Sequence, residues 1–189
     1  YYKAAVSGAP SIAASDAGYV KKVAGIDVPD EDLLSYLYDH AVSPHLAAQW
    51  EGHPLEKAVV EAAFAKAKEN FEYVTMEGSG GIMCPLRYDE TAHIFLEDVI
   101  QWFNLPTLLV AHAGLGTINA TVLTIEYLRA RNIPVKGVIL NFYTDSPMER
   151  DNKLMIEELT GVPVIACVPE GAKDLGVSAD TLAALYDEV

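Results

Sequence analysis

Residues 107–141, TLLVAHAGLGTINATVLTIEYLRARNIPVKGVILN, decide the fold. Two apolar runs, Thr107–Ala111 and Val135–Leu140, flank a segment with helical spacing, Gly116–Arg131. Both runs are rich in Val, Ile and Leu without polar alternation, which is typical of strands covered on both faces. A helix stop signal, Pro134, stands just before the second run. The stretch therefore predicts two parallel strands joined by a helical crossover.

The same alternation of strands and helices extends along the rest of the chain. Further strands are expected at Tyr1–Val6, Tyr73–Met76 and Val164–Val168. Helices are expected at Ser15–Ala24, Pro29–Tyr36, Leu55–Glu69, Thr91–Phe103, Ser146–Thr160 and Ala179–Val189. One apolar stripe is expected on the Gly116–Arg131 helix, formed by Ile118, Val122, Ile125 and Leu128. The prediction is a single α/β domain over residues 1–189, with a mostly parallel sheet and helices on both faces.

Composition narrows the class of protein. The 189 residues are 51% hydrophobic, enough for one well-buried core. Lys and Arg total 13 against 27 Asp and Glu, a formal charge of −14, which argues against binding to nucleic acid or to an anionic membrane. No apolar run reaches the roughly 18 residues of a membrane span. The two cysteines, Cys84 and Cys167, lie far apart and indicate reduced thiols of a cytoplasmic protein.

The residues that follow the strands are the candidates for chemistry. In open α/β sheets, ligands bind beyond the carboxyl ends of the strands. In and after the expected strands stand Lys3, Ser7, Glu77–Gly81, Gly114–Asn119, Asn141, Pro169 and Glu170. This set contains a cation, a hydroxyl, a carboxylate, two glycine-rich turns and an amide. It suits a phosphate, a metal ion and a nucleotide base.

Each candidate also has a purely structural interpretation. The turn at Glu77–Gly81 is a tight turn after a strand, or a place where Glu77 holds a cation such as Mg²⁺. Gly114–Asn119 opens a helix, whose N–H groups either bind an anion or are simply capped. Lys3 could be a solvated charge, Asp16 a helix cap, and Asn141 a turn residue. Pattern alone leaves both interpretations open. The histidines show no ligand spacing and receive no role: His40, His45, His53, His93 and His112.

Taken together, several segments resemble the dethiobiotin synthetase family. They are YYKAAVSG (1–8), SD (15–16), SPHLAA (43–48), EGSGGIMCPL (77–86), the run AGLGTINATVLTIEYLRARNIPVKGVILN (113–141) and VPE (168–170). They follow the family's order and cover nearly the whole chain. The resemblance implies a P-loop NTPase-like fold and a homodimer. It also implies an enzyme that uses ATP and Mg²⁺ to close a ureido ring from 7,8-diaminononanoate and CO₂, giving dethiobiotin for biotin biosynthesis.

The resemblance further implies a role for each candidate. Lys3 would be catalytic, contacting a carbamate and the transferring phosphoryl group, and Asp16 and Glu77 would hold Mg²⁺. Substrate would contact Ser7, Gly78, Ser79, Gly80 and Gly81. The substrate's tail carboxylate would be received, across the dimer interface, by Gly116, Thr117, Ile118 and Asn119. The adenine pocket would be formed by Asn141, Val168, Pro169 and Glu170.

One departure from the family is the missing phosphate loop, GxxxxGK[ST]. We expect it before Tyr1, in a strand, loop and helix of about 30 residues, so the sequence is interpreted as truncated at its front and inactive in this form. The alternative is a non-catalytic ligand-binding or regulatory module. A related amidoligase of cofactor synthesis ranks last, because neither cysteine has the surroundings of a nucleophile.

Overall fold

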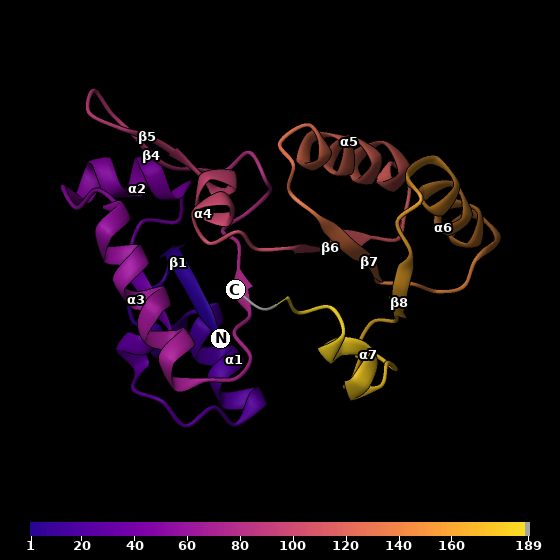
Figure 1. Cartoon of the computed structure of the whole chain (residues 1–189), viewed down its shortest axis with the longest axis horizontal. Helices are drawn as coiled ribbons and strands as arrows, with labels where there is room; N and C mark the ends of the chain where they lie inside the picture. The colour runs from indigo at the N-terminus through magenta and orange to yellow at the C-terminus, as the bar shows by residue number, and fades with distance from the viewer. Residues whose placement is uncertain (188–189) are drawn as a thin grey trace. The chain divides into compact units, whose positions relative to one another are not determined.

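The computed structural model describes residues 1–187, and the chain divides into two compact units, Tyr1–Val99 and the part from Ile100 onward. Each unit contains a parallel sheet of three strands. The strands of the second sheet are labelled β6, β7 and β8 in Figure 1. The α/β fold with mostly parallel strands is thereby confirmed. A single domain over residues 1–189 stays a prediction.

The first unit is built on a central, buried strand. Strand β1 (Tyr2–Ser7) pairs in parallel with β2 (Leu34–Tyr38) on one side and β3 (Met76–Glu77) on the other. An antiparallel hairpin, β4 (Pro85–Tyr88) and β5 (His93–Phe95), follows the sheet. The helices are α1 (Asp16–Ala24), α2 (Pro44–Glu51) and α3 (Lys57–Asn70), with short 3₁₀ turns at Ile12–Ala14 and Asp30–Asp32. Helix α4 (Leu96–Trp102) begins in this unit and ends in the second. The first five residues of β1 are buried, so this strand fixes the position of any side chain that leaves it.

The second unit contains the predicted strand–helix–strand segment of residues 107–141. Strands β6 (Thr107–His112), β7 (Val135–Asn141) and β8 (Val164–Val168) pair in that order, all parallel. The helices are α5 (Thr117–Arg129), α6 (Pro147–Thr160) and α7 (Ala179–Ala183). Helices α5 and α6 lie side by side over the sheet (Figure 1). The core between them and the sheet is formed by Ala113, Ile125, Val138, Leu140, Ile156 and Val162.

Three predicted helices are corrected by the structure. In Pro29–Tyr36 only a 3₁₀ turn forms, and the chain then enters β2, whose alternating burial is that of a strand. The first residues of Thr91–Phe103 form β5 because they pair with β4, so the helix begins only at Leu96. The helix predicted for Ala179–Val189 ends at Ala183, and its last two residues lie outside the described range.

The burial of the crossover helix also differs from its predicted stripe. Ile118 and Val122 are only half-buried, whereas Thr117 and Thr121 take the buried positions of the first two turns. The neighbouring strand β6 is not covered on both faces as predicted, since Val110 is 66% exposed. The buried side of the first two turns of α5 therefore presents two hydroxyl groups, where the predicted stripe would have presented two apolar side chains.

Candidate functional site

The first group of candidate residues gathers around Lys3. Its side chain leaves the central strand β1 and is almost fully buried. The ammonium Nζ donates to Glu77 Oε1 at 2.9 Å and also to the carboxylate of Asp16. Glu77 is the register partner of Lys3 on β3, and Asp16 begins helix α1. Two carboxylates from separate elements therefore converge on one buried cation.

Helix α1 positions Asp16 without using it as the cap. Ser15 is the N-cap, and its hydroxyl accepts from Gly18 N at 3.4 Å. Asp16 lies in the first turn, where one oxygen accepts from Ala17 N at 2.8 Å while the other meets Lys3. A carboxylate is favoured at this end of a helix by the partial positive charge of the N–H groups. The capping role considered for Asp16 therefore belongs to Ser15.

Tyr1 is a further member of this cluster that the sequence analysis did not identify. Its hydroxyl donates to Glu77 Oε2 at 2.6 Å. Burial, followed by the nearby Glu77 carboxylate, raises the pKa of the Tyr1 phenol far above its ordinary value. The sequence signal that could have identified Tyr1 is its spacing of two residues from Lys3, because side chains two apart in an extended segment face the same side.

The two serines of the predicted site make hydrogen bonds to the main chain. Ser7, at the end of β1, donates to Val42 O at 2.7 Å. Ser79 is buried and donates to Ala5 O, which ties the glycine-rich turn to β1. Both hydroxyls keep lone pairs that can accept a further bond. Ser79 is thus held by the fold, and Ser7 is the more accessible of the two.

The three glycines of the turn after Glu77 differ in their backbone conformation and in the space around them. A Cβ on Gly78 would lie 2.6 Å from Leu96 Cδ2, so the Leu96 side chain would have to move to admit it. Gly80 has a φ of +82°, a left-handed conformation that favours glycine. A Cβ on Gly81 would meet no atom within 4 Å, so the backbone is open on that side. Gly80 is therefore explained by its backbone conformation, whereas Gly81 offers backbone that is open on one side.

The carboxylate pair has the chemistry of a magnesium site. The Asp16 and Glu77 side chains are 46% and 43% exposed, so both can accept further ligands. Mg²⁺ is commonly bound by one or two carboxylates together with water and substrate phosphates. Within residues 1–187 no group of three or more His, Cys, Asp or Glu side chains is arranged to hold a metal ion. Two partly exposed carboxylates can supply oxygen ligands to a hard divalent ion whose remaining ligands are water.

The second group of candidates lies at the carboxyl ends of the strands of the second unit. His112 pairs in register with Asn141, and Asn141 pairs with Val168, so the ends of β6, β7 and β8 are adjacent. Asn141 Oδ1 accepts from Phe142 N at 3.0 Å, which leaves its amide nitrogen for another partner. Val168 O accepts from Tyr143 N at 2.9 Å, while Pro169 begins the exposed turn that contains Glu170. The structure thus brings together the predicted base-binding residues.

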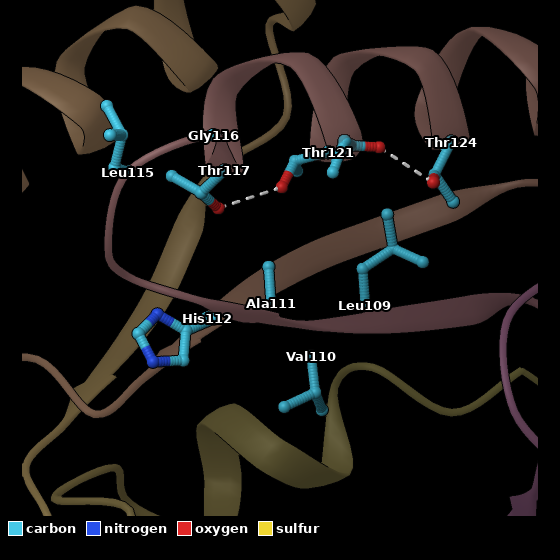
Figure 2. A pocket seen from close by; sticks show the side chains of 10 residues that line it. Leu109, Val110, Ala111, His112, Leu115, Gly116, Thr117, Thr121 and Thr124 are labelled. Carbon is cyan, nitrogen blue, oxygen red and sulfur yellow. Dashed lines mark hydrogen bonds between the residues drawn. The ribbon is translucent and has the colours of Figure 1, made fainter.

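A cavity of about 460 Å³ lies between β6 and the start of α5. Figure 2 shows Leu109 and Ala111 pointing from β6 toward the helix, and Thr117 and Thr121 facing them from α5. The hydroxyls of Thr117 and Thr121 lie 3.3 Å apart. Helix α5 begins after Gly116 (φ +92°), and no side chain caps it. An apolar cavity beside a helix start without a side-chain cap suits an aliphatic chain that carries an anionic group.

Side chains from α6 hold the loops that frame these strand ends. Asn152 is buried, and its Nδ2 donates to Ala113 O at 2.9 Å and to Gly114 O at 3.3 Å. Glu149 Oε2 accepts from Thr144 N at 2.8 Å, from Thr144 Oγ1 at 2.7 Å and from Ser146 N at 3.0 Å. These bonds lower the pKa of Glu149 to about 2. Neither residue was identified from the sequence, because both act through backbone atoms distant along the chain or in a loop.

His112 was assigned no role, yet it lines the cavity at the end of β6. Its Nδ1 accepts from Gly114 N at 2.9 Å, and its ring stacks on Phe142 with centroids 5.3 Å apart. The rule that ligands bind beyond strand ends would have included His112, since it is the last residue of β6.

Comparison with known proteins identifies the class first. A model of the family described as "AAA domain" matches residues 1–174. Together with the parallel sheets, this match places the chain among P-loop NTPase-like α/β proteins. Across residues 1–187, no helix is both long and apolar enough to cross a membrane.

Similar curated proteins then give the family. The "ATP-dependent dethiobiotin synthetase BioD" of Brachyspira hyodysenteriae is 52% identical over 172 residues, covering 90% of this chain and 78% of that protein. The protein of the same name from Clostridium novyi is 41% identical over 174 residues, covering 89% and 73%. That of Clostridium botulinum strain Eklund 17B is 41% identical over 192 residues, covering 99% and 84%. The chain belongs to the dethiobiotin synthetase family, and the predicted resemblance and enzyme class, a ligase, are confirmed.

Proposed function

We propose that this protein synthesises dethiobiotin in biotin biosynthesis, using ATP and Mg²⁺ to close a ureido ring from 7,8-diaminononanoate and CO₂. The observation that carries the proposal is the buried Lys3 ammonium between the carboxylates of Asp16 and Glu77. The names of the curated relatives support the product and the use of ATP. The substrates, the metal and the roles of individual residues are our proposals.

In the proposed reaction, one amine of the diamine attacks CO₂ and forms a carbamate. A carbamate oxygen takes the γ-phosphoryl group of ATP, and ADP leaves. The second amine then attacks the activated carbonyl, closes the ring and releases phosphate. Negative charge develops on the carbamate and phosphoryl oxygens, and Lys3 Nζ is the group we assign to stabilise it. Its burial supports this role, because a charge acts more strongly where water is excluded.

Asp16 and Glu77 are proposed to hold the magnesium ion. When bound, the ion would neutralise phosphate charge during phosphoryl transfer. Ser7 is proposed to hydrogen-bond the reacting end of the substrate, and the backbone around Gly81 to lie against it. The open side of Gly81 and the remaining lone pairs on Ser7 support these two assignments.

The cavity beside α5 is proposed to receive the tail of the diamine. The substrate is an aliphatic chain that ends in a carboxylate, which corresponds to an apolar wall with N–H groups at one end. The residues proposed to bind the carboxylate are Gly116, Thr117, Ile118 and Asn119. Asn141, Val168, Pro169 and Glu170 are proposed to contact adenine, supported by the free amide nitrogen of Asn141.

A cytoplasmic homodimer is also part of the proposal. Leu115, just before α5, is 93% exposed, and Leu123, within α5, is 61% exposed. These exposed apolar side chains support α5 as the surface that a second copy of the chain covers. Light scattering coupled to gel filtration tests the dimer. A monomer at micromolar concentration would refute it.

The activity is tested with protein produced from its complete reading frame. Incubation with 7,8-diaminononanoate, bicarbonate, Mg²⁺ and ATP should give dethiobiotin, ADP and phosphate in equal amounts, detected by mass spectrometry and a phosphate assay. Omitting the diamine should abolish phosphate release above background. Binding of ATP and diamine without product would instead favour a ligand-binding module, and no binding would refute both.

A further inference from the structure

We infer that Tyr1 is a positioning residue, which fixes the Glu77 carboxylate in the orientation that binds a divalent cation. The inference rests on the proposed function, since it gives Glu77 a metal to hold. Tyr1 directly precedes strand β1, and no role has been assigned to it above.

Glu77 is held at both oxygens by donors from a single extended segment. Tyr1 donates to Oε2 at 2.6 Å and Lys3 donates to Oε1 at 2.9 Å. Tyr1 and Lys3 are two residues apart in extended backbone, so their side chains leave the same face. The backbone bond from Tyr2 N to Thr75 O, at 2.9 Å, belongs to the first step of the pairing of β1 with β3, immediately after Tyr1. The pairing of β1 with β3 therefore sets both donors opposite Glu77.

The two donors, Tyr1 and Lys3, together fix the orientation of the Glu77 carboxylate, which one donor alone would not do. Lys3 alone would leave the carboxylate free to rotate about the bond to its terminal carbon. The second bond from Tyr1 restricts that rotation, so less side-chain entropy is lost when the carboxylate binds a cation. A carboxylate has about four lone-pair sites, so two remain for a cation after both bonds are made. Because the Glu77 side chain is 43% exposed, those sites are accessible.

Residues that orient metal ligands have measurable effects on affinity. Loss of such a partner typically weakens metal binding by about 10–100-fold. We expect the low end of this range, about tenfold, because Lys3 still holds one oxygen after the Tyr1 hydroxyl is removed. The ring itself packs against the cluster formed by Val6, Ala9, Ala17, Leu33 and Leu34, so the test must keep the ring. Tyr1→Phe does this.

The experiment is a double-mutant cycle on Mn²⁺ binding, with Mn²⁺ as the probe and free ion measured by electron paramagnetic resonance. The protein is produced from its complete reading frame and titrated without nucleotide. Tyr1→Phe should raise the Mn²⁺ dissociation constant about tenfold. In a Glu77→Gln background the same change should have no further effect, because Tyr1 acts through Glu77. Tyr19→Phe is the matched control, since it removes an exposed tyrosine hydroxyl from α1 and should leave binding unchanged.

The outcomes separate this inference from the proposed function. A dissociation constant for Tyr1→Phe within twofold of wild type, or equal effects in both backgrounds, would overturn the inference even if dethiobiotin is made. Coupling between Tyr1 and Glu77 in a protein that makes no dethiobiotin would uphold the inference and reject the activity. In active protein, Tyr1→Phe should need more Mg²⁺ for half-maximal rate yet approach wild-type kcat at saturation. A kcat that stays low at saturating Mg²⁺ would contradict a role through the metal.

Discussion

Replacing Lys3 by glutamine separates catalysis from folding. The change removes the ammonium that contacts both Asp16 and Glu77. Loss of a charged donor aimed at developing negative charge lowers kcat by about 10²–10³, equivalent to about 2.7–4 kcal/mol. KM for the diamine should change far less, because the charge matters most in the transition state.

The effect of this change on stability should be smaller than for an ordinary buried ion pair. Removing one partner of a fully buried pair costs about 3–5 kcal/mol, because the remaining charge is left without water. Here the two carboxylates are 46% and 43% exposed, so water can replace the ammonium. We therefore expect a loss of about 1–2 kcal/mol in the free energy of unfolding, which leaves a protein of ordinary stability folded.

The assay measures kcat and KM for dethiobiotin formation together with urea unfolding of each variant. Lys22→Gln is the matched control, since it removes an exposed lysine from α1 and should leave both measurements unchanged. The reasoning is refuted if Lys3→Gln keeps kcat within threefold of wild type while KM rises. That result would make Lys3 a binding residue.

Three further changes test other parts of the site. Glu77→Gln should raise the Mg²⁺ concentration for half-maximal activity, and an unchanged requirement would return Glu77 to the role of a turn residue. Asn141→Ala should weaken the preference for ATP over GTP in competition kinetics; an unaltered preference would count against contact with the base. Glu149 has a pKa lowered to about 2, so its stabilising effect is present above its ordinary value of 4.5 and is lost as pH falls toward 2. Glu149→Gln should therefore unfold at lower urea concentration than wild type at pH 6, with the gap closing by pH 2.5; an equal gap at both pH values would be inconsistent with this pKa.

The sequence predicted the strands of the second unit, but the strand predicted at Tyr73–Met76 was wrong for all its residues except Met76, which lies in β3. Val164–Val168 is a strand at the predicted bounds, and Val135–Leu140 differs from β7 by one residue. The helix prediction for Pro29–Tyr36 was wrong, because the tyrosine and leucine residues of β2 are buried where β2 pairs with β1, a strand distant in sequence. The Thr91–Phe103 prediction failed because the hairpin depends on a cross-strand partner as well.

The candidate site was predictable where a residue lies at a strand end or in a family motif. Lys3, Asp16 and Glu77 were chosen on those grounds, and the structure brings all three together. Tyr1 was missed because its role depends on which face of an extended segment it shares with Lys3. Asn152 was missed since a helix-interior amide gives no local signal of the loop that it holds.

The two bonds from Asn152 have a consequence for how the second unit can respond to a ligand. A single amide nitrogen fastens α6 to the main chain of Ala113 and Gly114, immediately before the cavity beside α5. The helix that carries this amide begins only a few residues after Asn141. A ligand that displaces α6 must therefore strain or break the hydrogen bonds of Asn152. Movement of α6 is in this way coupled to the loop that leads into the cavity beside α5.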